Sequence, residues 1–165
     1  GKTSKHSFYQ DEISHYPIDD IDAKIMQILS TEARISLIDL GNKINIDSKV
    51  VKYRIKKLEK EGIIIAYVSA PNFDKLGLQF IQINFNLKNI KTASSIIEFF
   101  DKTNKCLYAL ELLGKYDLTI EIHVENNDVL REIMEKFKQQ FVDKYNDYDI
   151  FNMYKEHLVV WLPIA

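Results

Sequence analysis

A row of lysines in the segment DSKVVKYRIKKLEKEG, residues 47–62, is the group of side chains in this sequence best suited to binding a charged ligand. The segment holds six Lys or Arg and three acidic residues, although the whole chain has a net charge of −2 and a pI near 6.1. An ammonium group carries a full positive charge and three hydrogen-bond donors, so a row of them attracts phosphate oxygens. A local basic surplus in a mildly acidic chain predicts a binding surface for a polyanion.

The spacing of these residues separates a buried helix face from a basic one. At about 100° per residue, a helix over residues 47–62 places Val51, Ile55 and Leu58 together on its apolar face. The expected DNA-binding residues are Ser48, at the start of this helix, and six residues on or beside the opposite face: Lys49, Lys52, Tyr53, Lys56, Lys57 and Lys60. Arg54 falls near the buried side, where a guanidinium needs a partner. We therefore expect Arg54 to brace the fold through a carboxylate.

Three short helices are predicted in residues 18–62. Apolar residues recur at helical spacing in two segments before the basic one, as Ile21, Ile25, Ile28 and Leu29, and then as Leu37, Leu40 and Ile44. Each predicted helix has a capping candidate, and the third also has a terminating glycine: Asp19 or Asp20, Ser36 (in a capping-box pattern with Asp39), Asp47 and Gly62. The second and third helices, joined by Asn45 and Ile46, form a helix-turn-helix pattern.

This motif presents its second helix to the major groove of double-stranded DNA. Lys57 and Lys60 are expected at phosphates, and the residues placed to reach bases are Lys49, Lys52, Tyr53 and Lys56. The following IIIAYVSAPN, residues 63–72, predicts a strand at the stem of a wing. The alternative is that the lysines only solvate an exposed helix.

The second half has a period of two, which indicates strands. FIQINFNL (80–87) and LTIEIHVE (118–125) alternate strictly, CLYALELL (106–113) is a third strand, GKYD a turn, and a last strand covers about 150–162. Two helices are marked by apolar residues at helical spacing: Ala93, Ile96, Ile97 and Phe100, then Leu130, Ile133, Met134, Phe137 and Phe141. The order βαββαβ predicts an α+β, ferredoxin-like domain with both helices on one sheet face and the other face free.

The free face carries His123 between Glu121 and Glu125, beside Gln82, Asn84, Asn86 and Thr119. No second His is placed to complete a metal or catalytic site, so we expect a solvated or partner-facing surface. No P-loop, GxGxxG or Ser–His–Asp pattern occurs, so we assign no catalytic residue, metal or cofactor. Cys106 is the single cysteine, and no apolar run is long enough for a membrane span. An intracellular, cytoplasmic protein is expected.

The two halves together resemble the leucine-responsive regulatory protein/AsnC (Lrp/AsnC, feast/famine) family of transcription regulators. The segments that carry the resemblance are IDDIDAKIMQIL, ARISLIDLGNKINID, VVKYRIKKLEKEGII and LGKYDLTIEI, the last being similar to the Gly-x-x-Asp turn of the family's regulatory (RAM) domain. The implied organisation is an irregular arm or junction at 1–17, a winged helix-turn-helix at 18–68, a linker at 69–77 and a RAM domain at 78–163.

The resemblance implies sequence-specific DNA binding through the third helix, dimerisation through the open sheet faces, and a small effector such as an amino acid near the turn. The implied effector residues are Leu113, Gly114, Tyr116 and Asp117. Leu113 replaces a common Ser or Thr of the family, so we expect weak or absent binding of ordinary amino acids.

Other assignments stay open at this point. The segment before Pro17 resembles the junction of tandem members, so the partner is expected to be a second copy, a higher oligomer or an N-terminal tandem half. Sirohaem decarboxylases resemble the same fold, which makes an enzyme of that kind one alternative. A ligand-sensing or assembly module with a vestigial helix-turn-helix is another.

Overall fold

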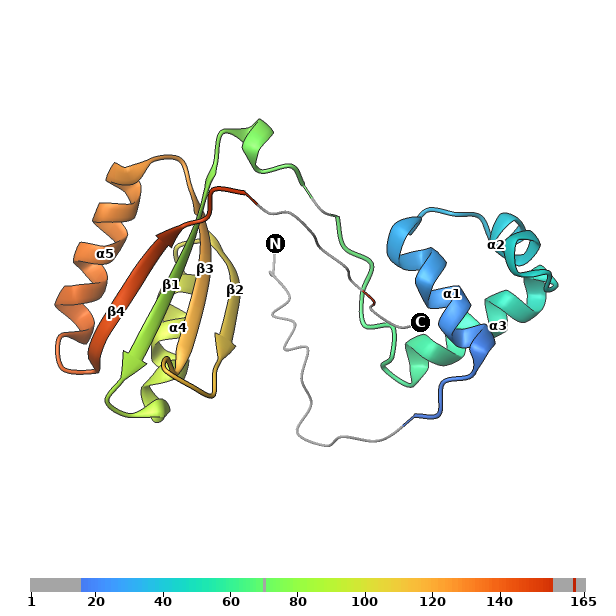
Figure 1. Cartoon of the computed structure of the whole chain (residues 1–165), viewed down its shortest axis with the longest axis horizontal. Coiled ribbons are helices and arrows are strands. Elements are labelled where there is room, and N and C mark those ends of the chain that lie inside the picture. Colours follow the sequence, from blue (N-terminus) through green and yellow to red (C-terminus); the bar gives the residue numbers. More distant parts are fainter. Residues whose placement is uncertain (1–15, 70, 156–161, 163–165) are drawn as a thin grey trace. The chain divides into compact units, whose positions relative to one another are not determined.

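The chain forms two compact units, divided between residues 69 and 70 (Figure 1). The computed structural model describes residues 16–69, 71–155 and 162. Among those residues, no helix combines the length and the apolar character needed to cross a membrane.

The N-terminal unit contains three helices, α1 (Asp20–Thr31), α2 (Leu37–Ile44) and α3 (Ser48–Lys60). The predicted caps are confirmed, because Asp19, Ser36 and Asp47 each accept a backbone N–H of the helix that follows. The backbone half of the predicted capping box forms, because the Asp39 N–H donates to Ser36 Oγ at 3.0 Å. The Asp39 carboxylate accepts the Ser36 hydroxyl, at 2.6 Å. The helices pack around Ile25, Leu40 and Val51, which are at most 1% exposed.

The turn between α2 and α3 requires a glycine. Asn45 adopts φ 57°, and the Ile46 N–H donates to the Gly41 carbonyl at 2.9 Å. A Cβ placed on Gly41 would lie 2.5 Å from the Ile46 carbonyl oxygen, which is closer than real Cβ contacts allow. Gly41 therefore sets the close approach of the two helices.

The third helix ends as predicted at Gly62, which has φ +69°. The Gly62 N–H donates to the Glu59 carbonyl at 3.1 Å and the Ile63 N–H to the Leu58 carbonyl at 2.9 Å, the hydrogen-bond pattern of a Schellman motif. The expected wing strand at 63–72 is wrong for the described residues 63–69 and 71–72, which form no strand. Tyr67 instead donates its hydroxyl to Glu59 of α3 at 3.1 Å.

The second unit is a four-stranded antiparallel sheet in the order β2-β3-β1-β4, as expected for a ferredoxin-like domain. Its elements are the 3₁₀ turn η1 (Asp74–Leu76), β1 (Gln79–Leu87), the 3₁₀ turn η2 (Ile90–Thr92), α4 (Ala93–Asp101), β2 (Cys106–Glu111), β3 (Leu118–Val124), α5 (Asn127–Phe141) and β4 (Tyr145–Asn152). The last strand corrects the expected 150–162: it begins five residues earlier, residues 153–155 are not strand, and 156–161 lie outside the described residues.

Both helices cover one sheet face, as predicted from the alternation (Figure 1). The inward residues of β1 and β3 form the core with α4 and α5: Ile81, Ile83, Phe85 and Leu87, with Leu118, Ile120, Ile122 and Val124, all at most 7% exposed. The opposite face presents Tyr108 and Leu110 of β2, and Phe151 of β4.

We predict that Gly41→Ala destabilises the N-terminal unit, although Ala is the better helix former. The added methyl group must displace the Ile46 backbone, at a cost of about 1–3 kcal/mol. Hydrogen exchange at the Leu40 and Val51 amides of the full chain measures this locally. Asn42→Ala, an exposed change on the same helix, is the matched control, and equal protection in both variants would contradict the prediction.

Candidate nucleic-acid interface

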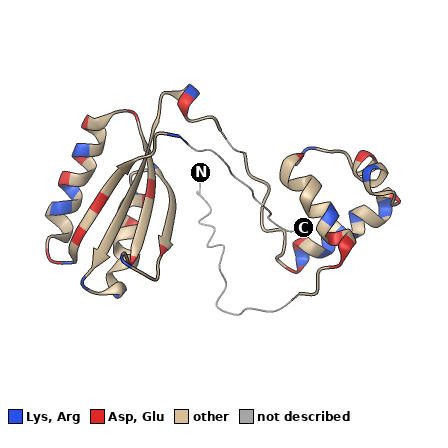
Figure 2. Cartoon of the chain, viewed as in Figure 1, with Lys and Arg blue, Asp and Glu red and all other residues tan. Residues whose placement is uncertain are grey.

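The exposed residues of α3 are mostly basic, as the helix rotation predicts. Figure 2 colours Lys and Arg blue along the ribbon. Val51 and Leu58 are fully buried and Ile55 is partly buried, which fixes the direction of the opposite face. Tyr53 is 65% exposed, Ser48 is half-buried, and the exposed lysines are Lys49, Lys52, Lys56, Lys57 and Lys60. One helix therefore brings together all seven residues that the sequence assigned to DNA contact.

Lys57 is held by a contact that the sequence did not predict. Its Nζ lies over the Tyr16 ring, 5.2 Å from the ring centroid. The hydrogen bond with Tyr16 raises the pKa of Lys57 above its usual value. Lys57 is therefore charged at neutral pH, and its side chain is oriented by Tyr16.

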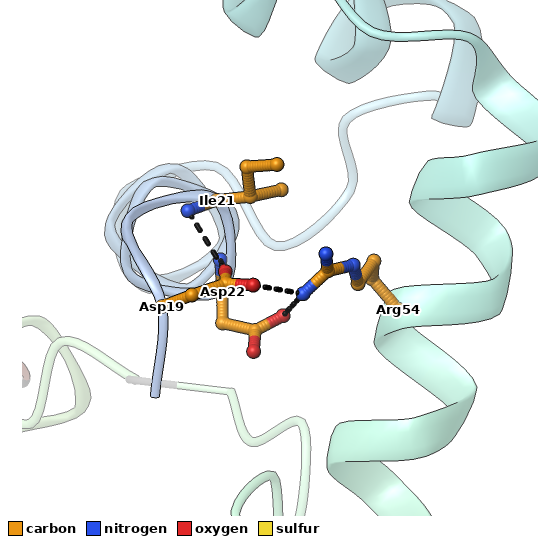
Figure 3. Close-up of polar contacts among 4 residues, drawn as sticks. All are labelled: Asp19, Ile21, Asp22 and Arg54. Atoms are coloured by element: carbon orange, nitrogen blue, oxygen red, sulfur yellow. Dashed lines mark hydrogen bonds and ion pairs between the residues drawn. The ribbon is translucent and has the colours of Figure 1, made fainter. Parts of the chain in front are cut away.

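Arg54 forms the predicted brace, and it does so with two carboxylates of α1 and its cap (Figure 3). Its Nη1 donates to Asp19 Oδ2 and, at 3.2 Å, to Asp22 Oδ1. The Arg54 side chain is 24% exposed and Asp22 is only 3% exposed. These two contacts join α1 and its cap to α3.

Asp19 has two structural roles. Its Oδ1 caps α1 by accepting the Ile21 N–H at 3.0 Å and the Asp22 N–H at 2.9 Å, while its Oδ2 accepts from Arg54. The hydrogen bonds from the Asp22 backbone and from Arg54 stabilise the ionised form, so the pKa of Asp19 is lowered. The hydrogen bond to Asp19 likewise raises the pKa of Arg54.

The four residues assigned to an effector lie on the turn between β2 and β3, where two of them make internal contacts. Leu113 is fully exposed, and Gly114 is exposed beside it. Tyr116 donates its hydroxyl to Asp149 of β4. Asp117 Oδ2 accepts the Leu87 N–H of β1 at 2.7 Å. Asp117 therefore ties the turn to the sheet, and an effector role for these residues stays a prediction.

His123 does not lie on a free surface, which corrects the expectation for that part of the open face. Its ring stacks on Phe73, with centroids 3.7 Å apart, and on Phe80 at 5.0 Å. The side chain is 8% exposed, and burial lowers the pKa of His123. In the part of the chain that the structure describes, no group of three or more His, Cys, Asp or Glu could hold a metal ion.

Comparisons with known proteins agree with this architecture. The family model for winged helix-turn-helix DNA-binding domains matches residues 18–65. The HTH-type transcriptional regulator LrpB of Bacillus subtilis (strain 168) is 30% identical over 139 residues, covering 84% of this chain and 90% of its own length.

Two solved structures show the same fold. The structure of Escherichia coli AsnC has a TM-score of 0.74 at 20% identity and covers 88% of this chain and 97% of its own. The transcriptional regulator NMB0573 of Neisseria meningitidis, solved as a complex with L-Met, has a TM-score of 0.77 at 18% identity and covers 88% and 96%.

We predict that the Asp19–Arg54 contact makes the stability of the N-terminal unit sensitive to acid. Because the folded-state pKa of Asp19 is lowered, its contribution is complete above the unfolded value of about 3.9 and is lost as the pH falls through the folded value. Asp19→Asn should therefore be less stable than the parent at pH 7, with the difference shrinking toward pH 2.5.

Thermal unfolding at both pH values measures this difference. Asp20→Asn, at an exposed position in the same helical turn, is the control and should track the parent. A constant gap between the parent and Asp19→Asn at both pH values would show that the ionised carboxylate contributes nothing.

Proposed function

The chain belongs to the Lrp/AsnC family of DNA-binding transcription regulators, and from this premise we propose that it inserts the basic face of α3 into the major groove of its operator. The observation that carries the proposal is the separation of charge on one helix. The lysines of α3 face solvent, whereas its arginine is turned inward to two carboxylates. A lysine-rich face of this kind supplies the cations that phosphate binding requires.

The lysines divide into two groups by position along the helix. Lys57 and Lys60 lie in the last turn of α3, and in our proposal they contact phosphates and set the register of the protein on the duplex. The residues nearer the helix N-terminus approach base edges in the groove, as recognition helices do: Ser48, Lys49, Lys52, Tyr53 and Lys56.

A second copy of the chain is the partner that we propose for the open face of the sheet. Tyr108 and Leu110 are each 39% exposed and Phe151 is 44% exposed on this face. Between them, Asn84 Oδ1 accepts from Thr119 at 2.6 Å and from Gln82 at 3.0 Å. These bonds satisfy Asn84 Oδ1, so a partner that covers this centre has to supply acceptors for the amide N–H groups of Asn84 and Gln82.

Dimerisation also serves DNA binding. One helix-turn-helix makes few contacts, and a two-fold dimer reads two half-sites about 34–36 Å apart. In this arrangement the second unit determines which pairs of half-sites are bound.

Salt dependence tests the groove assignment. If about four phosphates are neutralised per subunit, log affinity should fall with log salt at a slope of roughly −3.6 per subunit. Lys57→Ala should make this slope shallower by about one unit and weaken binding to all sequences about equally. The DNA probe is the duplex that the protein enriches most strongly from a random library. Its binding is measured by fluorescence anisotropy at several salt concentrations.

The double variant Lys49→Ala/Lys52→Ala separates base contact from phosphate contact. It should lose discrimination between the enriched duplex and a scrambled one. Lys24→Ala, on α1, removes one positive charge outside α3, against two in the double variant, and should keep the discrimination. If the double variant bound the enriched duplex like the parent, α3 would not be the reading helix.

Light scattering tests the dimer. We expect a species of about twice 19.3 kDa at tens of micromolar. Leu110→Lys should shift it toward the monomer, because the charge would be buried in the interface. Gln139→Lys, which adds the same charge at an exposed position on α5, should leave it unchanged. A parent that scatters only as a 19.3 kDa species would exclude self-pairing.

A further inference from the structure

We infer that the sequence preference of this protein is read by lysine contacts to guanine and by a tyrosine contact to thymine, with Arg54 of α3 excluded from the readout. The inference rests on the proposed insertion of α3 into the major groove and names the base chemistry of that site. Its support comes from which side chains α3 exposes and which one it withholds.

The exposed residues of α3 match only part of the base code of the major groove. Asparagine and glutamine, the side chains that pair with adenine through two hydrogen bonds, are absent from the helix Ser48–Lys60. Its exposed cationic donors are lysines, which bind the O6 and N7 acceptors of guanine. Lysine is thus the dominant polar reader on this helix, and guanine is its preferred base.

Arg54 would be the strongest guanine reader on α3, but its donors are directed elsewhere. Its Nη1 bonds to Asp19 and Asp22, and its side chain is 24% exposed. Turning Arg54 into the groove would leave the Asp22 carboxylate, 3% exposed, without its cation. An unpaired buried charge is strongly unfavourable, so Arg54 stays with its carboxylates when DNA binds.

Tyr53 supplies the apolar contact. It is 65% exposed and follows Lys49 by one helical turn, so it lies within the row of lysines. The aromatic edge of a side chain in the groove packs against the thymine methyl group, the apolar feature of that surface. Val50 is also exposed, at 42%, but the helix rotation puts it about 60° from Tyr53, at the border of the basic face.

The helical rise limits the length of the element that is read. At about 1.5 Å per residue, the seven steps from Lys49 to Lys56 span about 10.5 Å, or three steps of about 3.4 Å in one DNA strand. Each half-site should therefore contain a core of about four base pairs, with guanines on either strand and at least one thymine.

Removal of single atoms from the DNA tests this assignment. The duplex that the full chain enriches most strongly from a random library is resynthesised with 7-deazaguanine, which lacks the N7 acceptor, or with uracil, which lacks the methyl group, at one core position at a time. Modification of at least one guanine and at least one thymine should lower the affinity of the protein for the duplex about 5-fold or more. This is the factor that corresponds to a contact of about 1 kcal/mol.

Each loss should disappear in the variant that lacks its reader. The guanine effects should vanish in Lys49→Ala, Lys52→Ala or Lys56→Ala, and the thymine effect in Tyr53→Ala. The matched controls, Lys60→Ala for charge and Val50→Ala for apolar surface, should keep both effects. Arg54→Lys, which preserves the cation beside the carboxylates, should enrich the same core.

Several results would overturn the inference while leaving the proposed function in place. They are a core indifferent to both modified bases, effects that persist in all the lysine and tyrosine variants, and an Arg54→Lys protein whose enriched core changes at a guanine. Binding without enrichment of any sequence would overturn it as well. A chain that bound no duplex even at low salt would instead refute the proposed function.

Discussion

The guanidinium of Arg54, held between the carboxylates of Asp19 and Asp22, is the contact on which the geometry of the DNA-binding unit depends. Asp22 is buried and needs a cation, and Arg54 is the residue of α3 that provides it. Because Asp19 also caps α1, the start of one helix and the middle of another are fixed by the same carboxylate. With Arg54 turned inward, the rotation of α3 directs its lysines to solvent.

In the second unit, side-chain hydrogen bonds fix the open face and the neighbouring turn in a comparable way. Asn84 at the centre of the open face bonds to Gln82 and Thr119, and Asp117 holds the neighbouring turn to β1. On the same face, Tyr108 and Leu110 lie on β2 and Phe151 lies on β4, on either side of Asn84. Such a surface suits contact with a second copy, and it leaves the turn at Leu113 exposed beside it.

Interactions close in sequence or repeated along an element were predictable from the sequence. The helix caps, the Gly62 terminus, the inward turn of Arg54 and the alternation in β1 and β3 all follow from short spacings. Contacts between distant segments were not. The stacking of Phe73 on His123 joins residues with no common pattern, and Asp117 bonds to a strand 30 residues earlier.

The prediction was wrong for the wing strand at 63–72 and for the start of the last strand at 150, and in both cases the missing information is the contact with a distant segment. Residues 63–69 are rich in β-branched and aromatic residues, which favour a strand, but a strand also needs a paired neighbour, and sequence propensity cannot supply one. The start of β4 at Tyr145 was missed because its exposed face is polar, while its inward residues Tyr145 and Tyr148 pack on the core.

An NMR titration of the full chain with its enriched duplex shows whether α3 contacts DNA with its lysine face while Arg54 stays with its carboxylates. We expect the largest chemical-shift changes at the amides of residues 48–57 and at the Tyr53 ring, with the Arg54 side-chain Nε–H signal almost unmoved. Large movement of that Arg54 signal, or shifts concentrated in residues 78–155 with α3 unaffected, would contradict it.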